Sequence, residues 1–402
     1  MRILFLSRWF PYPPDNGSRI RVFSLIKHLS VRHQVDLISF ATDPVSDEQL
    51  KALGHYCHRV EVVRHRPFDP RRFRALIGFF SRRPRSVIDT YSVEMQRHVE
   101  EVGRNGLPDV IIASQLDMAP YAMALPTVPK ILEEVELTVL YEKYAKQSQL
   151  LKKLRKRLMW WKLSRYVADL LHIFDGCTVV SEQEREQVLQ VLPGYSPIQI
   201  VPNGVDTAHY AADFGAPEAD SLVYSGALTY FANFDAMSFF LQEVFPLIRA
   251  QRSNVKLSIT GRLDGAPIDR LACHEGVVFT GYLGDVRPTI GRSWSSVAPL
   301  RIGGGTRLKI LESLALGTPV VSTSKGAEGL DLEVERDILI ADEPADFAAA
   351  ILRLLQDRTL RDRLSHNGRQ TVKTRYDWDI IGQQLDDFIE MVVKRKNTRI
   401  NA

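Results

Sequence analysis

Cysteine is scarce in this sequence. Cys57, Cys177 and Cys273 are far apart and odd in number among 402 residues. No CxxC pair occurs, so neither a zinc site nor a disulfide framework is supported. This cysteine usage fits a reducing compartment, and we expect a cytoplasmic protein.

Long apolar runs are also missing. No uninterrupted stretch approaches the ~18 apolar residues that are needed to cross a bilayer, so we expect no membrane-spanning helix. The stretch Arg2–Ser7 is basic and then apolar, as in a signal peptide, but it is short and is followed by Arg8. It also lacks a small-residue cleavage site, so we interpret it as a first buried strand.

The composition has no strong charge imbalance. The net charge is +4, with 25% charged and 45% hydrophobic residues. These values are normal for a soluble globular protein and do not indicate a nucleic-acid binder. A chain of 402 residues suits two domains of about 150–200 residues each.

Motifs for metal and nucleotide cofactors are absent. No DxD-type carboxylate pair stands at the end of an expected strand, and histidines such as His172 and His209 lack metal-ligand spacing. Neither GxxxxGK[ST] nor GxGxxG in its usual spacing occurs at the most glycine-rich loop. We therefore predict no bound catalytic metal and no cofactor.

Short apolar runs alternate with amphipathic helical stretches, which is typical of parallel sheets covered by helices on both faces. The strands expected in the first half are Arg2–Ser7, Gln34–Phe40, Asp109–Ala113, Lys130–Glu133 and Cys177–Ser181. Those expected in the second half are Leu222–Ser225, Val255–Thr260, Val277–Thr280, Ser296–Pro299, Pro319–Ser322 and Ile338–Ala341. The helices expected in the first half are Ser18–Leu29 and Leu150–Leu171.

The alternation breaks at Pro202–Asp206, and a stretch rich in Pro, Gly, Asp and Ala follows to Asp220, which predicts an interdomain hinge. We therefore predict an α/β protein with two Rossmann-like, doubly wound domains that face a central cleft. Ligands of such sheets bind beyond the carboxyl ends of the strands, so the loops after the strands carry the candidate site.

One of these loops combines glycines with cations. It contains, in order, Gly303, Gly304, Gly305, Thr306, Arg307, Leu308 and Lys309. Glycines let a backbone approach a ligand closely, and free amides at a helix start attract an anion. Cations are unfavourable in a first helical turn, so Arg307 and Lys309 are explained if a diphosphate binds there. The alternative is a flexible glycine turn with two solvated basic side chains.

The helix after this loop continues as Leu311–Val321, LESLALGTPVV, and the hinge contains PNGVD at 202–206. Both segments resemble the retaining, nucleotide-sugar-dependent glycosyltransferases of family 4, which have the GT-B fold. The resemblance covers nearly the whole chain. It implies that Glu312 hydrogen-bonds the ribose of the nucleotide, and that the departing phosphate accepts the proton of the acceptor hydroxyl.

Three positions depart from the pattern of that family. Position 304 is Gly where the family has a first acid, and Gln115 stands where a His is frequent. The loop after Leu222–Ser225, which begins at Gly226, lacks the usual Arg and Lys. We expect Arg307 and Lys309 to supply this charge as the catalytic groups. The donor-binding residues expected beside them are Gly17, Ser18, Gly226, Gly303, Gly304, Gly305, Thr306, Leu308 and Glu312.

The loop RWFPYPPDNGSRIR, residues 8–21, joins the first strand to the first helix. By the resemblance it faces the donor, so Gly17, Ser18 and Arg21 are assigned to the cleft. The sequence of this loop also resembles that of a subgroup that is associated with exopolysaccharide assembly. The alternative is an ordinary turn followed by a helix cap.

Two basic clusters lie in the first half, at 64–85 and at 152–162, the second with Leu151, Leu154, Leu158 and Trp161 on one stripe. Such a surface fits peripheral contact with anionic lipid and a lipid-linked or glycan acceptor. The alternative is a solvated helix whose stripe packs on the domain core. We expect no nucleic-acid partner.

The predicted function is transfer of a hexose from a nucleoside diphosphate sugar to a hydroxyl with retention of configuration, in exopolysaccharide or other cell-surface glycan synthesis. The predicted domains are an acceptor domain at 1–203, a donor domain at 204–375, and a final helix at 376–402 that crosses back to the first domain. Two alternatives remain: a sugar-nucleotide 2-epimerase, and a non-catalytic sugar-nucleotide-binding partner of a polysaccharide assembly complex.

Overall fold

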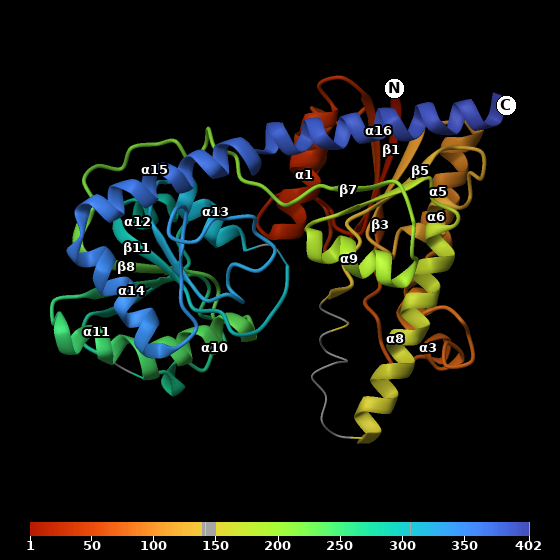
Figure 1. The fold of residues 1–402 in the computed structure, drawn as a ribbon. Coiled ribbons are helices and arrows are strands. Elements are labelled where there is room, and N and C mark those ends of the chain that lie inside the picture. Colours follow the sequence, from red (N-terminus) through yellow and green to blue (C-terminus); the bar gives the residue numbers. More distant parts are fainter. Residues whose placement is uncertain (139–140, 142–149, 273, 306, 402) are drawn as a thin grey trace. The chain divides into compact units, whose positions relative to one another are not determined.

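The computed structural model describes residues 1–138, 141, 150–272, 274–305 and 307–401 (Figure 1). Its internal contacts divide the chain into two compact units. The first unit comprises Met1–Asn203 and Ile381–Ala402, and the second comprises Gly204–Ile380. Each unit is built on one parallel sheet.

The first unit contains a seven-stranded sheet in the order β3-β2-β1-β4-β5-β6-β7. The strands are β1 (Arg2–Ser7), β2 (Gln34–Ala41), β3 (Arg59–Arg64), β4 (Val110–Ser114), β5 (Lys130–Glu133), β6 (Gly176–Val179) and β7 (Ile198–Ile200). The chain reverses its direction of winding between β1 and β4, so the loops after these two strands flank the switch point of the sheet.

Helices connect these strands as a parallel sheet requires. They are α1 (Gly17–Leu29), α2 (Asp47–Gly54), α3 (Phe73–Ile77), α4 (Arg85–Thr90), α5 (Val93–Arg104), α6 (Ala119–Ala122), α8 (Leu150–Leu171) and α9 (Glu182–Val191). Strands β1 and β4 contribute wholly buried apolar residues to the core, and α5, α6 and α8 pack on it.

The last helix, α16 (Trp378–Asn401), belongs to the first unit from Ile381 onward. Its Asp386 is buried and accepts hydrogen bonds from Arg32 and His33, each at 2.6 Å. Farther along, the ammonium of Lys396 lies 2.8 Å from the carboxylate of Asp175. These pairs, together with buried apolar residues of α16, fix the helix to this unit.

The second unit contains a six-stranded sheet in the order β10-β9-β8-β11-β12-β13. The strands are β8 (Glu218–Ser225), β9 (Lys256–Thr260), β10 (Val277–Gly281), β11 (Ser293–Ala298), β12 (Val320–Ser322) and β13 (Leu339–Ile340). The helical segments are α10 (Phe231–Phe239), the π-helical turn η1 (Phe240–Val244), α11 (Phe245–Gln251), the 3₁₀ turn η2 (Ile268–Arg270), α12 (Arg287–Gly291), α13 (Leu308–Ala315), α14 (Pro344–Gln356) and α15 (Arg358–Arg375). The switch point of this sheet lies between β8 and β11.

The predicted alternation of strands and helices is confirmed, and so is the α/β class with two doubly wound parallel sheets. Two strands were missed, β3 and β7, which form the edges of the first sheet. Strand β3 reads RVEVVR, with charged residues and only one wholly buried side chain, and β7 has three residues. Edge strands are shorter and more polar than central ones, so they lack the continuous apolar run that marks the others.

Candidate functional site

The carboxyl edge of the second sheet places three loops beside the switch point. Gly226 follows β8, Gly261 follows β9, and residues 299–307 follow β11. The first two loops are in close contact, because the amide of Gly226 donates to the carbonyl of Thr260 at 3.0 Å. A β carbon on Gly261, whose φ is +119°, would lie 2.6 Å from the carbonyl carbon of Gly226. Glycine is therefore required there by both space and conformation.

The third loop contains the predicted glycine turn. Gly303 has a φ of +100° and Gly305 a φ of +81°, whereas Thr306 lies outside the described residues. The guanidinium of Arg307 donates to the carbonyls of Gly304 at 2.7 Å and Gly303 at 2.9 Å. Arg307 is buried, and it closes the turn from the inside. The sequence alone does not indicate this role of Arg307.

Lys309 lies in the first turn of α13 and points to the floor of the site. Its ammonium donates to the hydroxyl of Tyr224 at 2.8 Å and to the side-chain oxygen of Asn233 at 3.0 Å. It also lies 4.0 Å from the centroid of the Tyr224 ring, within cation–π range. Burial, and after it the charge of Arg307, lowers the pKa of Lys309 to about 7, while Glu312 opposes this.

Gly226 borders this ammonium, whereas Gly303 lies against Ala232 of α10. A β carbon on Gly226 would lie 2.7 Å from the Nζ atom of Lys309 and 2.9 Å from the Nδ2 atom of Asn233. A β carbon on Gly303 would approach the side chain of Ala232 to 3.2 Å. The structure thus brings Gly226 against the enclosed ammonium of Lys309, and Arg307 joins the glycine turn to the start of α13.

Glu312 lies one turn beyond Lys309 on α13. The hydroxyl of Tyr210 donates a hydrogen bond to its carboxylate. Burial raises the pKa of Glu312, although this hydrogen bond and the charge of Lys309 both oppose the shift. Leu308 begins α13, and its side chain packs against the apolar cluster that contains Leu311, so its amide rather than its side chain remains for a ligand.

Sequence reasoning missed Tyr224 and Asn233 in this site, and Arg262 in the neighbouring loop after β9. The first two fix the position of Lys309 and come from β8 and α10. Arg262 follows Gly261 at the carboxyl edge and is exposed, and its carbonyl accepts from the amide of Leu228 at 3.0 Å. The one signal that could have found Arg262 is the order Thr-Gly-Arg directly after an apolar strand.

In the first unit, the loop after β1 ends in the N-cap of α1. The side chain of Asn16 accepts from the amide of Arg19 at 3.2 Å, and Gly17 and Ser18 form the first turn, with Gly17 exposed. The assignment of Arg21 to a ligand site is wrong. Arg21 is 0% exposed, and its guanidinium lies 2.6 Å from the carboxylate of Glu133.

Arg21 instead supports a group of carboxylates at the carboxyl edge of the first sheet. Gln115 after β4 and Glu134 after β5 are non-glycine residues with φ of +71° and +58°, and the Gln115 amide nitrogen donates to Glu134 at 2.9 Å. Burial raises the pKa of Glu134 to about 8, and Glu133 and Glu136 add to this against the charge of Arg21. Strained backbone of this kind is concentrated at functional sites.

Two further properties bear on what the site can do. Within the part of the chain that the structure describes, no group of three or more His, Cys, Asp or Glu residues is arranged to hold a metal ion. Among the same residues, no helix is long and apolar enough to cross a membrane.

Two family models match the chain in succession. The model described as Glycosyltransferase Family 4 matches residues 15–209, and the model described as Glycosyl transferases group 1 matches residues 219–357. The second range contains Gly226, the glycine turn, Lys309 and Glu312.

Relatives of this chain include three bacterial and archaeal proteins. An uncharacterised glycosyltransferase of Methanocaldococcus jannaschii is 24% identical over 54% of this chain, which spans 61% of that protein. An uncharacterised 44.6 kDa protein in the cps region of Klebsiella pneumoniae is 19% identical over 94% of this chain and 96% of its own length. The capsular polysaccharide biosynthesis glycosyltransferase CapM of Staphylococcus aureus is 29% identical over 38% of this chain and 42% of its own.

The fold is similar to that of solved glycosyltransferase structures. The crystal structure of HepE of Anabaena in complex with UDP superposes with a TM-score of 0.68 at 15% identity, over 97% of this chain and 100% of that one. The matching models, the relatives and the two parallel sheets lead to one conclusion: the chain belongs to the group 1, family 4 glycosyltransferases and has their GT-B fold.

Proposed function

We propose that this protein transfers a hexose from a nucleoside diphosphate sugar to a hydroxyl acceptor with retention of configuration, in the synthesis of an exopolysaccharide or another cell-surface glycan. The observation that carries the proposal is the ammonium of Lys309, which lies enclosed at the switch point beside Gly226 and is held by Tyr224. Support for the donor class comes from the UDP complex of HepE, and support for the product class comes from CapM.

In this proposal the diphosphate binds against the start of α13. Lys309 provides the positive charge, and the amides of Gly303–Gly305 and Leu308 provide hydrogen-bond donors. Thr306, which lies outside the described residues, would complete this set. Arg307 contributes its charge from beneath the turn, because its guanidinium is engaged with the carbonyls of Gly303 and Gly304. Together these groups stabilise the charge that develops on the departing diphosphate, and no metal ion is required for that task.

Glu312 would hold the ribose of the nucleotide by accepting a hydrogen bond from a hydroxyl. Tyr210 orients the carboxylate for this contact. Gly17 and Ser18 of the first unit would approach the sugar phosphate. As the family resemblance implies, the departing phosphate would accept the acceptor's proton, so no enzymic nucleophile is needed.

A thermal-shift panel of UDP-, GDP- and ADP-sugars on the wild type and on Lys309→Met tests the donor site. We expect one donor class to raise the melting temperature of the wild type and to lose most of this effect in the variant. Equal stabilisation of both proteins would overturn the assignment of Lys309. For the catalytic step, loss of one such charge-stabilising group lowers the rate by about 10²–10³.

One feature of the first unit, a carboxylate with a raised pKa, favours the alternative function of a sugar-nucleotide 2-epimerase. Such an enzyme needs an acid–base carboxylate, and Glu134 has a raised pKa at the carboxyl edge of the first sheet. Incubation with the matching donor alone separates the two activities. An epimerised sugar nucleotide supports the epimerase, whereas a glycosylated product that forms only with an acceptor supports the transferase.

A further inference from the structure

A surface of the first unit, formed by residues 73–83, exposes large apolar side chains that none of the described residues of the unit covers. Phe80 is 96% exposed and Phe73 is 76% exposed, and Leu76 and Ile77 lie between them with about half of their surface in solvent. Monomeric soluble proteins rarely expose a contiguous apolar patch of this kind unless it binds something. Short helix α3 and the turn after it therefore form a surface that requires a partner.

Helix α8 extends the same surface. The ammonium of Lys162 donates to the carbonyl of Phe79 at 2.6 Å, which joins α8 to the turn after α3 (Figure 1). Leu154, Leu158 and Trp161 on α8 are each more than half exposed. The alternative that this stripe packs on the domain core is therefore wrong for these three residues, and Leu151 has no described side chain.

The charge of this surface has one sign. Residues 73–83 contain three arginines and no acidic residue, and residues 150–168 contain seven Lys and Arg and again no acidic residue. Among the described residues, no carboxylate pairs with Arg82, Arg83, Arg155 or Arg157. Apolar side chains interspersed with unneutralised cations are complementary to the anionic surface of a bilayer, where each basic residue contributes about 1 kcal/mol.

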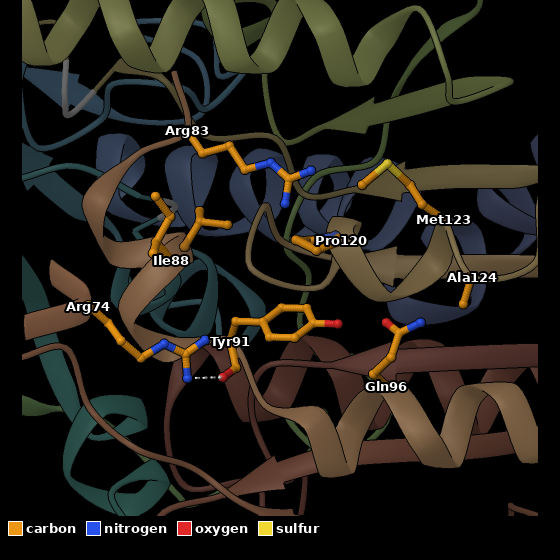
Figure 2. Close-up of a pocket in the computed structure, with 9 residues that line it drawn as sticks. Arg74, Arg83, Ile88, Tyr91, Gln96, Pro120, Met123 and Ala124 are labelled. Atoms are coloured by element: carbon orange, nitrogen blue, oxygen red, sulfur yellow. Dashed lines mark hydrogen bonds between the residues drawn. The ribbon is translucent and has the colours of Figure 1, made fainter. Parts of the chain in front are cut away.

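A cavity of about 410 Å³ opens beside this surface. Its lining includes Arg74, Arg83, Tyr91 and Gln96, and Figure 2 shows Arg83 across the cavity from Tyr91 and Gln96. Arg74 donates to the carbonyl of Tyr91 at 3.4 Å. The cavity is lined by two guanidinium groups and no acidic residue, and guanidinium groups bind phosphate oxygens strongly.

We propose that residues 73–83 and helix α8 dock on an anionic bilayer, and that the cavity between Arg74 and Arg83 receives the phosphate of a lipid-anchored acceptor from that bilayer. This inference rests on the proposed transferase function and deepens it, because it assigns the acceptor to a class: a phosphate-bearing lipid. The apolar side chains enter the interfacial region, and the arginines bind the headgroup.

Vesicle co-sedimentation tests the docking step. We expect full-length protein to bind phosphatidylcholine vesicles that contain phosphatidylglycerol and not pure phosphatidylcholine vesicles. The variant Phe73→Ser/Phe80→Ser should weaken binding by about tenfold or more, since two large apolar groups no longer enter the bilayer. Val31→Ser, which changes an 81% exposed residue elsewhere in the same unit, is the matched control. Equal binding of both variants and the wild type would overturn the docking surface.

Phosphatidic acid, which carries a terminal monophosphate, tests the cavity. At equal surface charge, the wild type should bind vesicles with phosphatidic acid several-fold more tightly than vesicles with phosphatidylglycerol. Arg74→Gln/Arg83→Gln should lose this preference, whereas Arg82→Gln, which does not line the cavity, should retain it. Absence of any preference in the wild type would overturn a lipid-anchored ligand, and so would loss of the preference when millimolar inorganic phosphate is added.

Donor binding separates this inference from the function on which it rests. The docking and cavity variants should keep the thermal shift with the sugar nucleotide, which also shows that they are folded. If donor binding persists but no variant alters vesicle binding, the acceptor inference fails alone. If vesicle binding behaves as expected but no donor binds, the proposed function fails instead.

Discussion

The ammonium of Lys309 lies 2.7 Å from the point that a β carbon on Gly226 would occupy. The absence of a side chain at position 226 therefore lets a cation from α13 reach the floor formed by β8 and α10. The cation is held there by the Tyr224 hydroxyl and the Asn233 side chain. A site for an anion is thus organised before any ligand binds, which lowers the cost of ordering it on binding.

Gly226→Ala should weaken donor binding. The new methyl group would meet the side-chain ends of Lys309 and Asn233 rather than backbone, and the φ of +157° adds backbone strain. We expect the dissociation constant for the matching sugar nucleotide, measured by calorimetry, to rise by about tenfold or more, because a charge-assisted hydrogen bond of about 1.5–3 kcal/mol is disturbed. Gly265→Ala, where φ is +77° and an added β carbon meets nothing within 4 Å, is the control for this strain. Equal affinities of the two variants would contradict the assigned role of Gly226.

Donor affinity should fall as the pH rises above about 7. The pKa of Lys309 is lowered from 10.5 to about 7 by burial and by Arg307, so the side chain loses its charge above that value in the free protein. A bound diphosphate favours the charged form of Lys309. Above the pKa of the free protein, Lys309 must therefore take up a proton when the donor binds, and the affinity falls by up to about tenfold per pH unit. Calorimetry in buffers of different ionisation enthalpy measures this uptake.

Lys309→Arg provides the comparison, because a guanidinium stays charged throughout this range. We expect proton uptake to disappear in this variant and its affinity to depend less on pH. Unchanged proton uptake in Lys309→Arg would mean that another group titrates on binding.

Arg21→Met should destabilise the first unit strongly. The side chains of Arg21 and Glu133 are both 0% exposed, and the guanidinium lies 2.6 Å from the carboxylate. Removal of one partner therefore leaves the charge of the other buried and uncompensated. We expect a loss of about 3–5 kcal/mol in the free energy of unfolding, measured with urea. The double variant Arg21→Met/Glu133→Gln should recover part of this loss.

The neighbouring Arg19→Met is the control for Arg21. Arg19 pairs with partly exposed Asp15 at 3.1 Å, and such exposed pairs contribute about 1 kcal/mol or less. A comparable loss in both variants would show that the buried pair is not what stabilises the unit.

The central strands could be predicted from sequence because buried parallel strands are continuous apolar runs, as in Arg2–Ser7 and Lys130–Glu133, whose bounds were predicted correctly. The glycine turn and Lys309 could be predicted as a candidate site because a cation is unfavourable in a first helical turn unless an anion binds there. Tyr224 and Asn233 could not, because they precede Lys309 by 85 and 76 residues, and only the folded sheet brings them to it. The burial of Arg21 was missed because its partner Glu133 follows 112 residues later.

Glu134 gives the first unit a pH dependence of the opposite sign to that of an ordinary carboxylate. Its pKa rises from 4.5 in the unfolded chain to about 8 in the folded one, mainly through burial. Between these values the folded protein binds more protons than the unfolded protein, so this group makes stability fall as the pH rises from 4.5 to 8. Glu134→Gln keeps the size of the side chain and cannot ionise. The variant should therefore lose this slope, and its free energy of unfolding should exceed that of the wild type by about 1–3 kcal/mol above pH 8, because no charge is left buried there.

Urea denaturation of the wild type, Glu134→Gln and the exposed control Glu94→Gln across this pH range measures the difference. A wild-type slope that persists in Glu134→Gln would assign the proton to Glu136, whose pKa is also raised by burial.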